Sequence, residues 1–334
     1  MIASDAPSNL FNLHFAYAYG ESPAVARFRV KVDDFQVDED LGFVATGDGE
    51  HIYLQVKKTG QNTDWLAKQL ASFAGVKAND VGYCGRKDRH AVCSQWFSVY
   101  QARAEIERFQ HFTIPGVSVL KVTRHSHKLR LGQHAANRFR IVLRDVENID
   151  ALMQRVPIVK QGVPNYFGEQ RFGHDGNNLH DGLQWLKGKK HIRDKKQRGL
   201  ILSALRAYVF NTVLSERVLQ NNWQQTLAGD TTTVRATGPL WGRGRTLVQG
   251  ETAELEQLAL TEFAELCHFL EHCGLQQERR ALACAPRDFQ IGQNDNNIQL
   301  DFLLGSGEFA TTVLRELVTL KNESLSSCRK APVV

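Results

Sequence analysis

One carboxylate lies among cations shortly after two glycines. The segment is Gly-Tyr-Cys-Gly-Arg-Lys-Asp-Arg-His-Ala, residues 82–91, and its carboxylate is Asp88, between Lys87 and Arg89. Neighbouring cations, Arg86 included, favour the ionised form of a carboxyl group, and glycines let the backbone approach a substrate closely. The pattern predicts a nucleophile or an acid–base group that acts on an anionic substrate. The alternative is a surface ion pair.

Positive charge gathers in two stripes. The chain has 334 residues and a formal net charge of +5, which suits a polyanionic partner without requiring one. Residues 121–144 contain seven Lys and Arg and no acid, and residues 187–198 contain seven with Asp194 as the single acid. Each stripe suits contacts with phosphates, and a solvated helix face or loop is the alternative.

Several classes of protein are disfavoured by the sequence. No apolar run approaches the roughly 20 residues of a membrane span, and the first 30 residues lack the order of a signal peptide. We therefore expect a soluble, cytoplasmic protein whose six cysteines are reduced. The glycine pairs at 242–244 and 305–307 lack the ending of a phosphate-binding loop, so we expect no nucleotide cofactor. We also expect no metal, because Cys267 and Cys273 fall on a different helical arc from His268 and His272.

Alternating apolar and polar residues predict strands in the first half of the chain. Residues 28–39 and 51–57 read as a hairpin joined by 42–49, and residues 63–73 read as a helix capped by Thr63. Further strands are expected at 92–100, 116–123 and 138–143. The segment around Asp88 therefore falls on a loop between a helix and a strand, where catalytic residues are commonly displayed.

The character of the chain changes from about residue 151. Pro157, Gly162 and Pro164 break the pattern, and helical spacing then dominates at 182–186, 200–221 and 253–272. Alternation returns at 289–302, and residues 310–317 read as a last strand or helix. These features predict an α+β fold in which a mainly helical region interrupts a sheet domain.

The motif made of Gly85, Lys87, Asp88, Arg89, Ala91 and Gln95 resembles the first signature of the TruD family of tRNA pseudouridine synthases. Other family signatures match in order, at Asp34–Glu39, Asn137–Phe139, Asn165–Gly173, Arg206–Asn211 and Gly307–Glu316. The resemblance covers residues 29 to about 318. It departs from the family at Cys84 and Cys93, where members often have small residues or Thr, and Cys93 argues against a hydroxyl role at that position.

The resemblance implies an α+β fold and an activity. We expect a pseudouridine synthase catalytic domain with a mixed, mainly antiparallel sheet in residues 1–154, an inserted, mainly helical α/β TRUD domain in 155–303, and a return segment in 304–334. The implied reaction converts the uridine at position 13 of tRNA to pseudouridine without a cofactor. We expect tRNA as the partner, no membrane association and a monomer.

The resemblance also assigns roles to residues. Asp88 is expected to be the nucleophile or essential carboxylate, through attack at C1′, attack at C6 or removal of a ribose proton. Phe35, Asn137 and Phe309 are expected to hold a flipped-out uridine, although a Phe in an alternating strand is more often a core residue. The supporting residues are Lys87, Arg89, Phe139 as a pocket wall and Glu39 as the partner of a cation.

Two questions stay open at the level of sequence. The aromatic residues of 165–173 suit either RNA contact or burial at a hinge. A catalytically silent RNA-binding or RNA-chaperone protein on the same scaffold, or a hydrolase of small nucleotides, would share some of these features. The complete motif around Asp88 favours the enzyme over the silent protein, because an anion placed against phosphates repels them.

Overall fold

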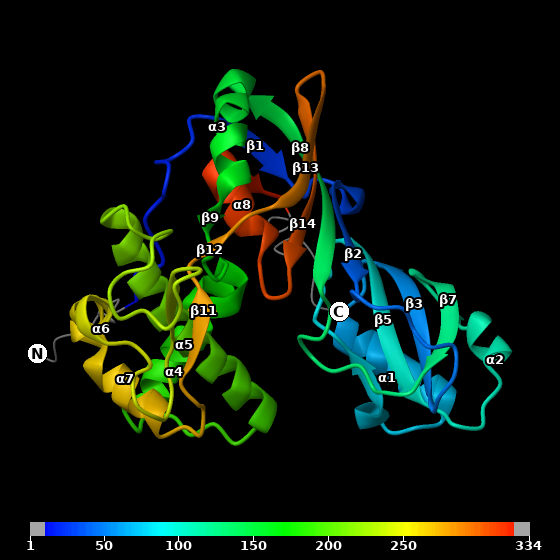
Figure 1. The fold of residues 1–334 in the computed structure, drawn as a ribbon. Helices are drawn as coiled ribbons and strands as arrows, with labels where there is room; N and C mark the ends of the chain where they lie inside the picture. The colour runs from blue at the N-terminus through cyan, green and yellow to red at the C-terminus, as the bar shows by residue number, and fades with distance from the viewer. Residues whose placement is uncertain (1–10, 324–334) are drawn as a thin grey trace, which may run out of the picture. The chain divides into compact units, whose positions relative to one another are not determined.

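The chain folds into two compact units, each built from separate segments. The computed structural model describes residues 11–323 (Figure 1). Among the described residues, unit 1 comprises 11–21, Gln161–Ala285 and Thr311–Glu316. Unit 2 comprises Ser22–Lys160, Pro286–Ala310 and 317–323.

Unit 2 contains most of the strands. Its elements are β1 (Val25–Phe28), β2 (Phe35–Asp40), β3 (His51–Thr59), α1 (Thr63–Ala74), β4 (Val81–Tyr83), β5 (Val92–Tyr100), α2 (Glu107–Gln110), β6 (Thr113–Ile114), β7 (Val117–His125), β8 (Ala136–Glu147), α3 (Ile149–Gln161), β13 (Arg287–Asn294), β14 (Asn297–Gly305) and β15 (Thr319–Asn322). Short 3₁₀ helices lie at Val32–Asp34 and Ala78–Asp80.

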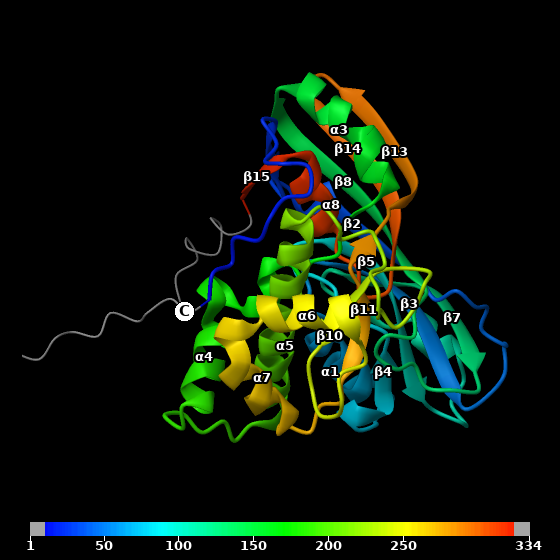
Figure 2. The same cartoon turned by 60° about the vertical axis from the view of Figure 1, so that its left-hand side comes forward.

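Unit 1 is mainly helical. Its elements are β9 (Val163–Pro164), α4 (Asn177–Leu186), α5 (Lys195–Leu219), β10 (Thr237–Leu240), α6 (Gly250–Ala259), α7 (Ala264–Glu271), β11 (Glu278–Ala281), β12 (Ala283–Cys284) and most of α8 (Ala310–Leu317), with 3₁₀ helices at Glu169–Phe172, His174–Gly176 and Thr261–Phe263. Figure 2 shows α4, α6 and α7 gathered around α5, whose apolar residues Leu205, Val209 and Val213 are buried.

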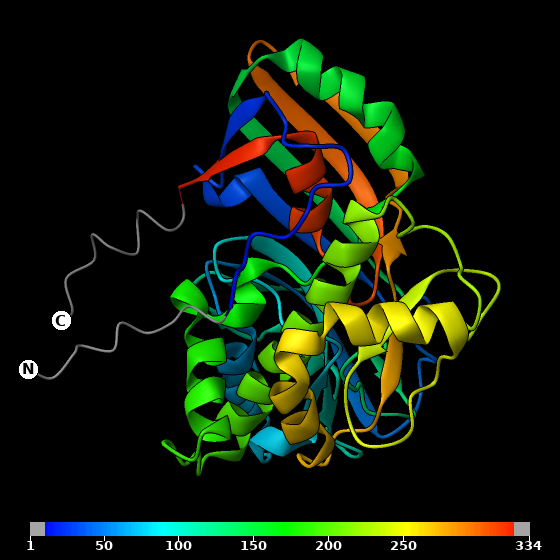
Figure 3. The same cartoon turned by 90° about the vertical axis from the view of Figure 1, so that its left-hand side faces the viewer.

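A mixed, mostly antiparallel sheet organises unit 2. Its order is β13-β14-β8-β2-β5-β3-β7-β6, and within that path only the β2–β5 pair is parallel. Strand β15 lies beside β1 in a parallel pair (Figure 3), and β1 also pairs with β8. The predicted α+β class is therefore confirmed.

The predicted hairpin is wrong, because β5 lies between β2 and β3. Strand β2 pairs with β5 and β8, and β3 pairs with β5 and β7. Alternation shows that a segment is a strand and which residues share a face, but it does not show which edges pair. The predicted strand 28–39 is also interrupted, because Arg29 has a φ of 57° and a 3₁₀ helix follows.

The helical predictions hold with three corrections. Asn62, and not Thr63, caps α1, since its side chain accepts hydrogen bonds from the amides of Asp64 and Trp65. Helix α3 continues through Pro157, which removes one backbone donor without ending the helix. The segment 253–272 contains two helices, α6 and α7, separated by a 3₁₀ turn. Residues 310–317 form helix α8.

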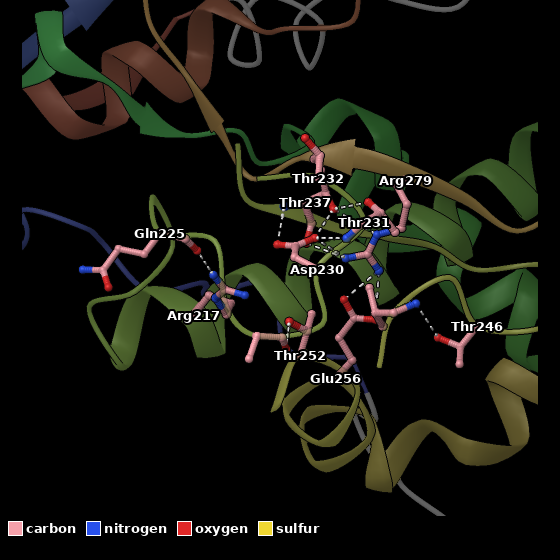
Figure 4. A network of polar contacts seen from close by, with 12 residues as sticks. Arg217, Gln225, Asp230, Thr231, Thr232, Thr237, Thr246, Thr252, Glu256 and Arg279 are labelled. Atoms are coloured by element: carbon pink, nitrogen blue, oxygen red, sulfur yellow. Dashed lines mark hydrogen bonds and ion pairs between the residues drawn. The ribbon is translucent and has the colours of Figure 1, made fainter. Parts of the chain in front are cut away.

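A buried polar network ties together the elements of unit 1 (Figure 4). Arg279 of β11 lies 2.7 Å from Glu256 of α6, and it donates to the carbonyl of Thr237 of β10 at 2.6 Å. Thr237 donates in turn to Asp230, in the loop that follows α5, at 2.7 Å. The Arg279 side chain is 8% exposed and that of Asp230 is 1% exposed, so the ion pairs of Arg279 lie where water barely reaches.

We expect Arg279→Met to destabilise unit 1, because it removes the cation that forms ion pairs with the buried Asp230 and Glu256. Removing one partner of a buried ion pair costs about 3–5 kcal/mol, which corresponds to a fall of roughly 10 °C in Tm for a domain of this size. Calorimetry of the full chain would measure it, with the exposed Arg235→Met as the matched control. A Tm for Arg279→Met equal to that of the control would contradict the role assigned to the network.

Candidate active site

Asp88 lies on a loop between β4 and β5 that is fixed to the sheet and to α1. Gln95 of β5 donates to the carbonyl of Gly85 at 2.5 Å, and its oxygen accepts from the Thr63 hydroxyl at 3.1 Å. The Thr63 oxygen accepts in turn from the amide of Lys87 at 3.0 Å. Gln95 and Thr63 therefore fix the backbone of the loop at Gly85 and Lys87, just before Asp88.

Lys58 holds the same loop from inside the unit. Its side chain is fully buried, and its ammonium group donates to the carbonyls of Gln61 at 2.8 Å and of Asp88 at 3.1 Å. Burial lowers the pKa of Lys58 because water no longer solvates the charge. The sequence prediction missed this residue. The pattern that could have revealed Lys58 is its spacing in the strand, where it falls on the same inward-facing side as Ile52, Leu54 and Val56.

The cation that pairs with Asp88 is Arg29, which the sequence prediction also missed. The Arg29 guanidinium forms an ion pair with the Asp88 carboxylate. The Arg29 side chain is 4% exposed, whereas that of Asp88 is 32% exposed. The guanidinium also lies over the rings of Phe35, at 4.3 Å, and Phe28, at 4.9 Å. The pair thus has a buried cation and a carboxylate that solvent reaches.

The cations next to Asp88 in sequence have other partners. Lys87 lies 2.7 Å from Glu39, Arg86 lies 3.2 Å from Asp64, and Arg89 donates to the carbonyl of Gly60 at 3.3 Å. The expectation that these residues supply the counter-charge therefore overlooked Arg29, which lies 59 residues earlier in the chain. Proximity in sequence did not predict the ion pair because the loop turns these side chains toward different elements.

A second polar chain lies beside Asp88. Glu39 accepts from the amide of Trp96 at 2.9 Å and pairs with Lys87, whose ammonium also donates to the Asn137 oxygen at 2.6 Å. The Asn137 nitrogen lies 3.0 Å from Nε2 of His134. Burial, and then the charge of Lys87, lower the pKa of His134. Asn137 keeps one donor and one acceptor for a further partner.

The aromatic candidates occupy different environments. Phe35 is 3% exposed, and its ring meets those of Phe28 at 5.6 Å and Phe139 at 5.9 Å. Phe139 stacks on Phe302 at 5.7 Å. Phe309 is partly buried in the link between β14 and α8. Asp88, Phe35 and Phe139 are therefore joined through Arg29 and the ring contacts. Glu39, Lys87 and Asn137 form a separate polar chain, which adjoins this group because Lys87 directly precedes Asp88.

The cysteines near the site are buried thiols. Cys93 lies below the loop, with its sulfur 3.9 Å from the carbonyl of Asp88. Burial raises the pKa of Cys93 to about 11 and that of Cys84 to about 12. The five described cysteines are free, and Cys328 lies outside the described residues.

The aromatic segment 165–173 is packed inside unit 1. Tyr166 is 2% and Phe172 is 1% exposed. The side-chain amide of Asn211 bonds both the amide and the carbonyl of Phe167, at 2.9 and 3.0 Å, and Arg280 lies over the Phe167 ring at 4.2 Å. These contacts favour burial over RNA contact for this segment.

The two basic stripes differ. In the first stripe, Arg138, Arg140 and Arg144 form ion pairs with Asp301, Asp38 and Asp34. In the second stripe, most side chains are exposed, and Lys190 pairs with Asp181 at 2.6 Å. Among residues 11–323, no helix is long and apolar enough to cross a membrane.

Comparisons with known proteins agree with this arrangement. The family described as "tRNA pseudouridine synthase D (TruD)" matches residues 14–191 and 232–317. A tRNA pseudouridine synthase D from Cellvibrio japonicus is 47% identical over 94% of this chain and 96% of its own length. The corresponding protein from Methylococcus capsulatus is 43% identical over 90% of this chain and 93% of its own.

A solved structure shows the same fold. It is described as a tRNA pseudouridine synthase D (TruD) from Methanosarcina mazei, and it superposes with a TM-score of 0.64 over 91% of this chain and 95% of its own, at 18% identity. The family match covers far more than half of the sequence, and the relatives match it nearly end to end. The chain belongs to the TruD family of tRNA pseudouridine synthases, which are isomerases.

Proposed function

We propose that this protein converts the uridine at position 13 of tRNA to pseudouridine, with Asp88 as the essential carboxylate. The observation that carries the proposal is the ion pair between Asp88 and Arg29. The carboxylate reaches solvent, its cation is buried, and its backbone is fixed by Lys58, Thr63 and Gln95. A carboxylate held in one orientation at the edge of a site suits attack on a substrate or removal of a proton.

The reaction needs no net change in atoms or electrons. The bond between N1 of uracil and C1′ of ribose breaks, and a bond between C5 and C1′ forms. The proton on C5 is lost, and N1 gains a proton. Asp88 assists by attack at C1′, by attack at C6, or by removal of the ribose proton as a glycal forms. In each route the carboxylate shares its electron pair with the substrate or a proton, so its negative charge decreases.

Arg29 is suited to this change of charge. When Asp88 forms a bond with the substrate, the guanidinium loses part of its counter-charge while it stays buried. A cation over an aromatic face is stabilised by the electrons of the ring, and Arg29 lies over both Phe35 and Phe28. We propose that this contact supports Arg29 during the step in which Asp88 is engaged.

Asn137 and two aromatic residues complete the proposed nucleotide pocket. A uridine in folded RNA must leave its stack to react, and an amide with a remaining donor and acceptor can read its edge. We propose that Asn137 has this role, with Phe35 and Phe309 as the aromatic residues and Phe139 as a wall. Lys87 and Glu39 position Asn137, and Arg89 lies at the exposed rim of the loop.

The second basic stripe is the proposed contact with the tRNA backbone. Lys187, Lys189, Arg193, Lys195 and Lys196 are exposed around the link between α4 and α5. This stripe belongs to unit 1. We propose that the inserted TRUD domain, expected at 155–303, is the helical part of that range, Gln161–Ala285, because β13 and β14 belong to the sheet of unit 2. The sheet of unit 2 would then be the core of the catalytic domain.

The central prediction concerns Asp88. We expect Asp88→Asn to lower the rate of pseudouridine formation by about 10³-fold or more, because an amide is a poor nucleophile and a poor base. The measurement is pseudouridine mapping on an unmodified tRNA transcript, with tRNA binding measured in parallel. The exposed Asp150→Asn is the matched control and should react at the wild-type rate.

The outcomes of this test separate the candidate functions. Undiminished product with Asp88→Asn would remove Asp88 from the mechanism. Wild-type protein that binds tRNA but forms no product would support the silent RNA-binding alternative. Turnover of free uridine nucleotides would support the small-molecule hydrolase.

A second prediction concerns Lys58 as a positioning residue. Lys58→Met removes the ammonium group that holds the carbonyls of Gln61 and Asp88, so we expect kcat to fall by roughly 10²-fold while KM for tRNA changes little. Lys57→Met is a matched control, because the neighbouring side chain is exposed. Single-turnover kinetics measure the effect, and a Tm within a few degrees of wild type shows that the fold is kept. A wild-type kcat in a folded Lys58→Met protein would contradict the role.

A third prediction concerns the second basic stripe. We expect Lys187→Gln combined with Lys189→Gln to reduce the salt dependence of tRNA binding, with a loss of roughly 0.7–0.9 in the slope of log K against log salt for each phosphate contact removed. The measurement is binding at several salt concentrations. The control is Lys68→Gln combined with Lys77→Gln, two exposed lysines of unit 2. Equal slopes for the two double variants would exclude these lysines as phosphate contacts.

A further inference from the structure

We infer that unit 1 carries a binding site for a divalent transition metal, formed by His268 and Glu271 of α7 and by His272, the residue that caps its C-terminal end. Each residue offers one ligand atom, and these atoms all lie within 4.8 Å of one another. Residues three and four positions apart share one face of a helix, so His268 faces both other residues. A zinc ion with bonds of roughly 2.0–2.2 Å holds its ligands about 3–4 Å apart, so small rotations of exposed side chains would close the site.

The hydrogen bond of His272 fixes which of its nitrogens is available. Nδ1 of His272 lies 2.8 Å from the carbonyl oxygen of His268. A carbonyl only accepts, so Nδ1 carries the hydrogen and Nε2 has the free lone pair. A backbone carbonyl that orients a histidine in this way is a common second partner in metal sites.

Glu271 is oriented by a second hydrogen bond. The indole Nε1 of Trp241 donates to Oε1 of Glu271 at 3.0 Å. The other carboxylate oxygen, Oε2, lies 4.0 Å from Nδ1 of His268. Trp241 therefore holds one oxygen and leaves the other directed toward the histidine, as expected for a carboxylate that binds a metal.

The surroundings leave room for the remaining positions of a metal. A hollow of about 450 Å³ is lined by Arg243, Gly244, Glu271, His272 and Gly274. A metal held by three protein ligands keeps an open coordination position, which water or an exchangeable ligand can occupy. The negative end of the α7 dipole favours a cation at these residues, and Glu271 offsets the positive charge of Arg243 on the same hollow.

The ligand set differs from the one rejected on the sequence. Cys267 and Cys273 are not part of the proposed ligand set, because Cys267 is 5% exposed and Cys273 packs against the core of unit 1. The third ligand is Glu271, which lies three residues after His268 and one before His272. Two imidazoles and one carboxylate suit zinc and its neighbours in the first transition series.

The test is a titration of the full-length protein, without a histidine tag, with Zn²⁺. Calorimetry or competition with a chromophoric chelator should detect a site that is weakened at least about tenfold in His272→Ala and in Glu271→Gln. His191→Ala, which changes an exposed histidine of the same unit, should bind as wild type does.

A second variant tests the orientation of the site without removing a ligand. Trp241→Phe keeps an aromatic ring but loses the donor to Glu271, and we expect zinc affinity to fall by about tenfold. Zinc binding that is equal in wild type and in a folded His268→Ala and His272→Ala double variant would overturn the proposal, as would the absence of zinc binding by wild type. Both readouts are independent of pseudouridine formation.

Discussion

The buried cations of unit 2 impose the constraint on which the candidate active site depends. Lys58 is fully buried, and the side chains of Arg29 and Lys87 are 4% and 6% exposed. A buried charge without a partner costs several kcal/mol, so each of these cations must meet oxygen atoms. Lys58 uses backbone carbonyls, Arg29 uses the Asp88 carboxylate, and Lys87 uses Glu39 and Asn137. The loop conformation that brings Asp88 to Arg29 also brings its carbonyl to Lys58 and lets Lys87 reach Glu39 and Asn137. The position of the Asp88 carboxylate therefore follows from the need to pair these three buried cations.

Exposure distinguishes the polar clusters of this protein. The network of Arg279, Glu256, Asp230 and Thr237 has side chains that are 8% exposed or less, and these residues belong to four segments of unit 1. A cluster without an open side stabilises a fold. The pair of Asp88 and Arg29 has one buried and one accessible member, and the cluster of His268, Glu271 and His272 is largely exposed beside a hollow. Clusters of these two kinds have room for a ligand.

The sequence predicted local features better than the pairing of distant ones. The strand 92–100 and the helix that begins at Thr63 followed from periodicity, because periodicity reports which face is buried. The separation of β2 from β3 by β5 depends on contacts between segments far apart in sequence. Arg29 was missed for the same reason, since its role needs a left-handed backbone conformation and a partner 59 residues away. Lys58 was a different case, because its inward phase in β3 was visible and needed only a physical interpretation.

The aromatic residues of the candidate site differ in exposure, and this difference suggests different roles in the proposed pocket. Phe35 already has a guanidinium over its ring at 4.3 Å and two aromatic neighbours, and it is 3% exposed. A base that stacked on the face over which Arg29 lies would have to displace this cation, and that would separate Arg29 from Asp88 during the reaction. We therefore propose that Phe35 acts on the nucleotide through Arg29, by holding the cation that pairs with the Asp88 carboxylate. In the proposed pocket, direct stacking then falls to Phe309, which is less deeply buried and lies in a link between β14 and α8, where a side chain can adjust to a base.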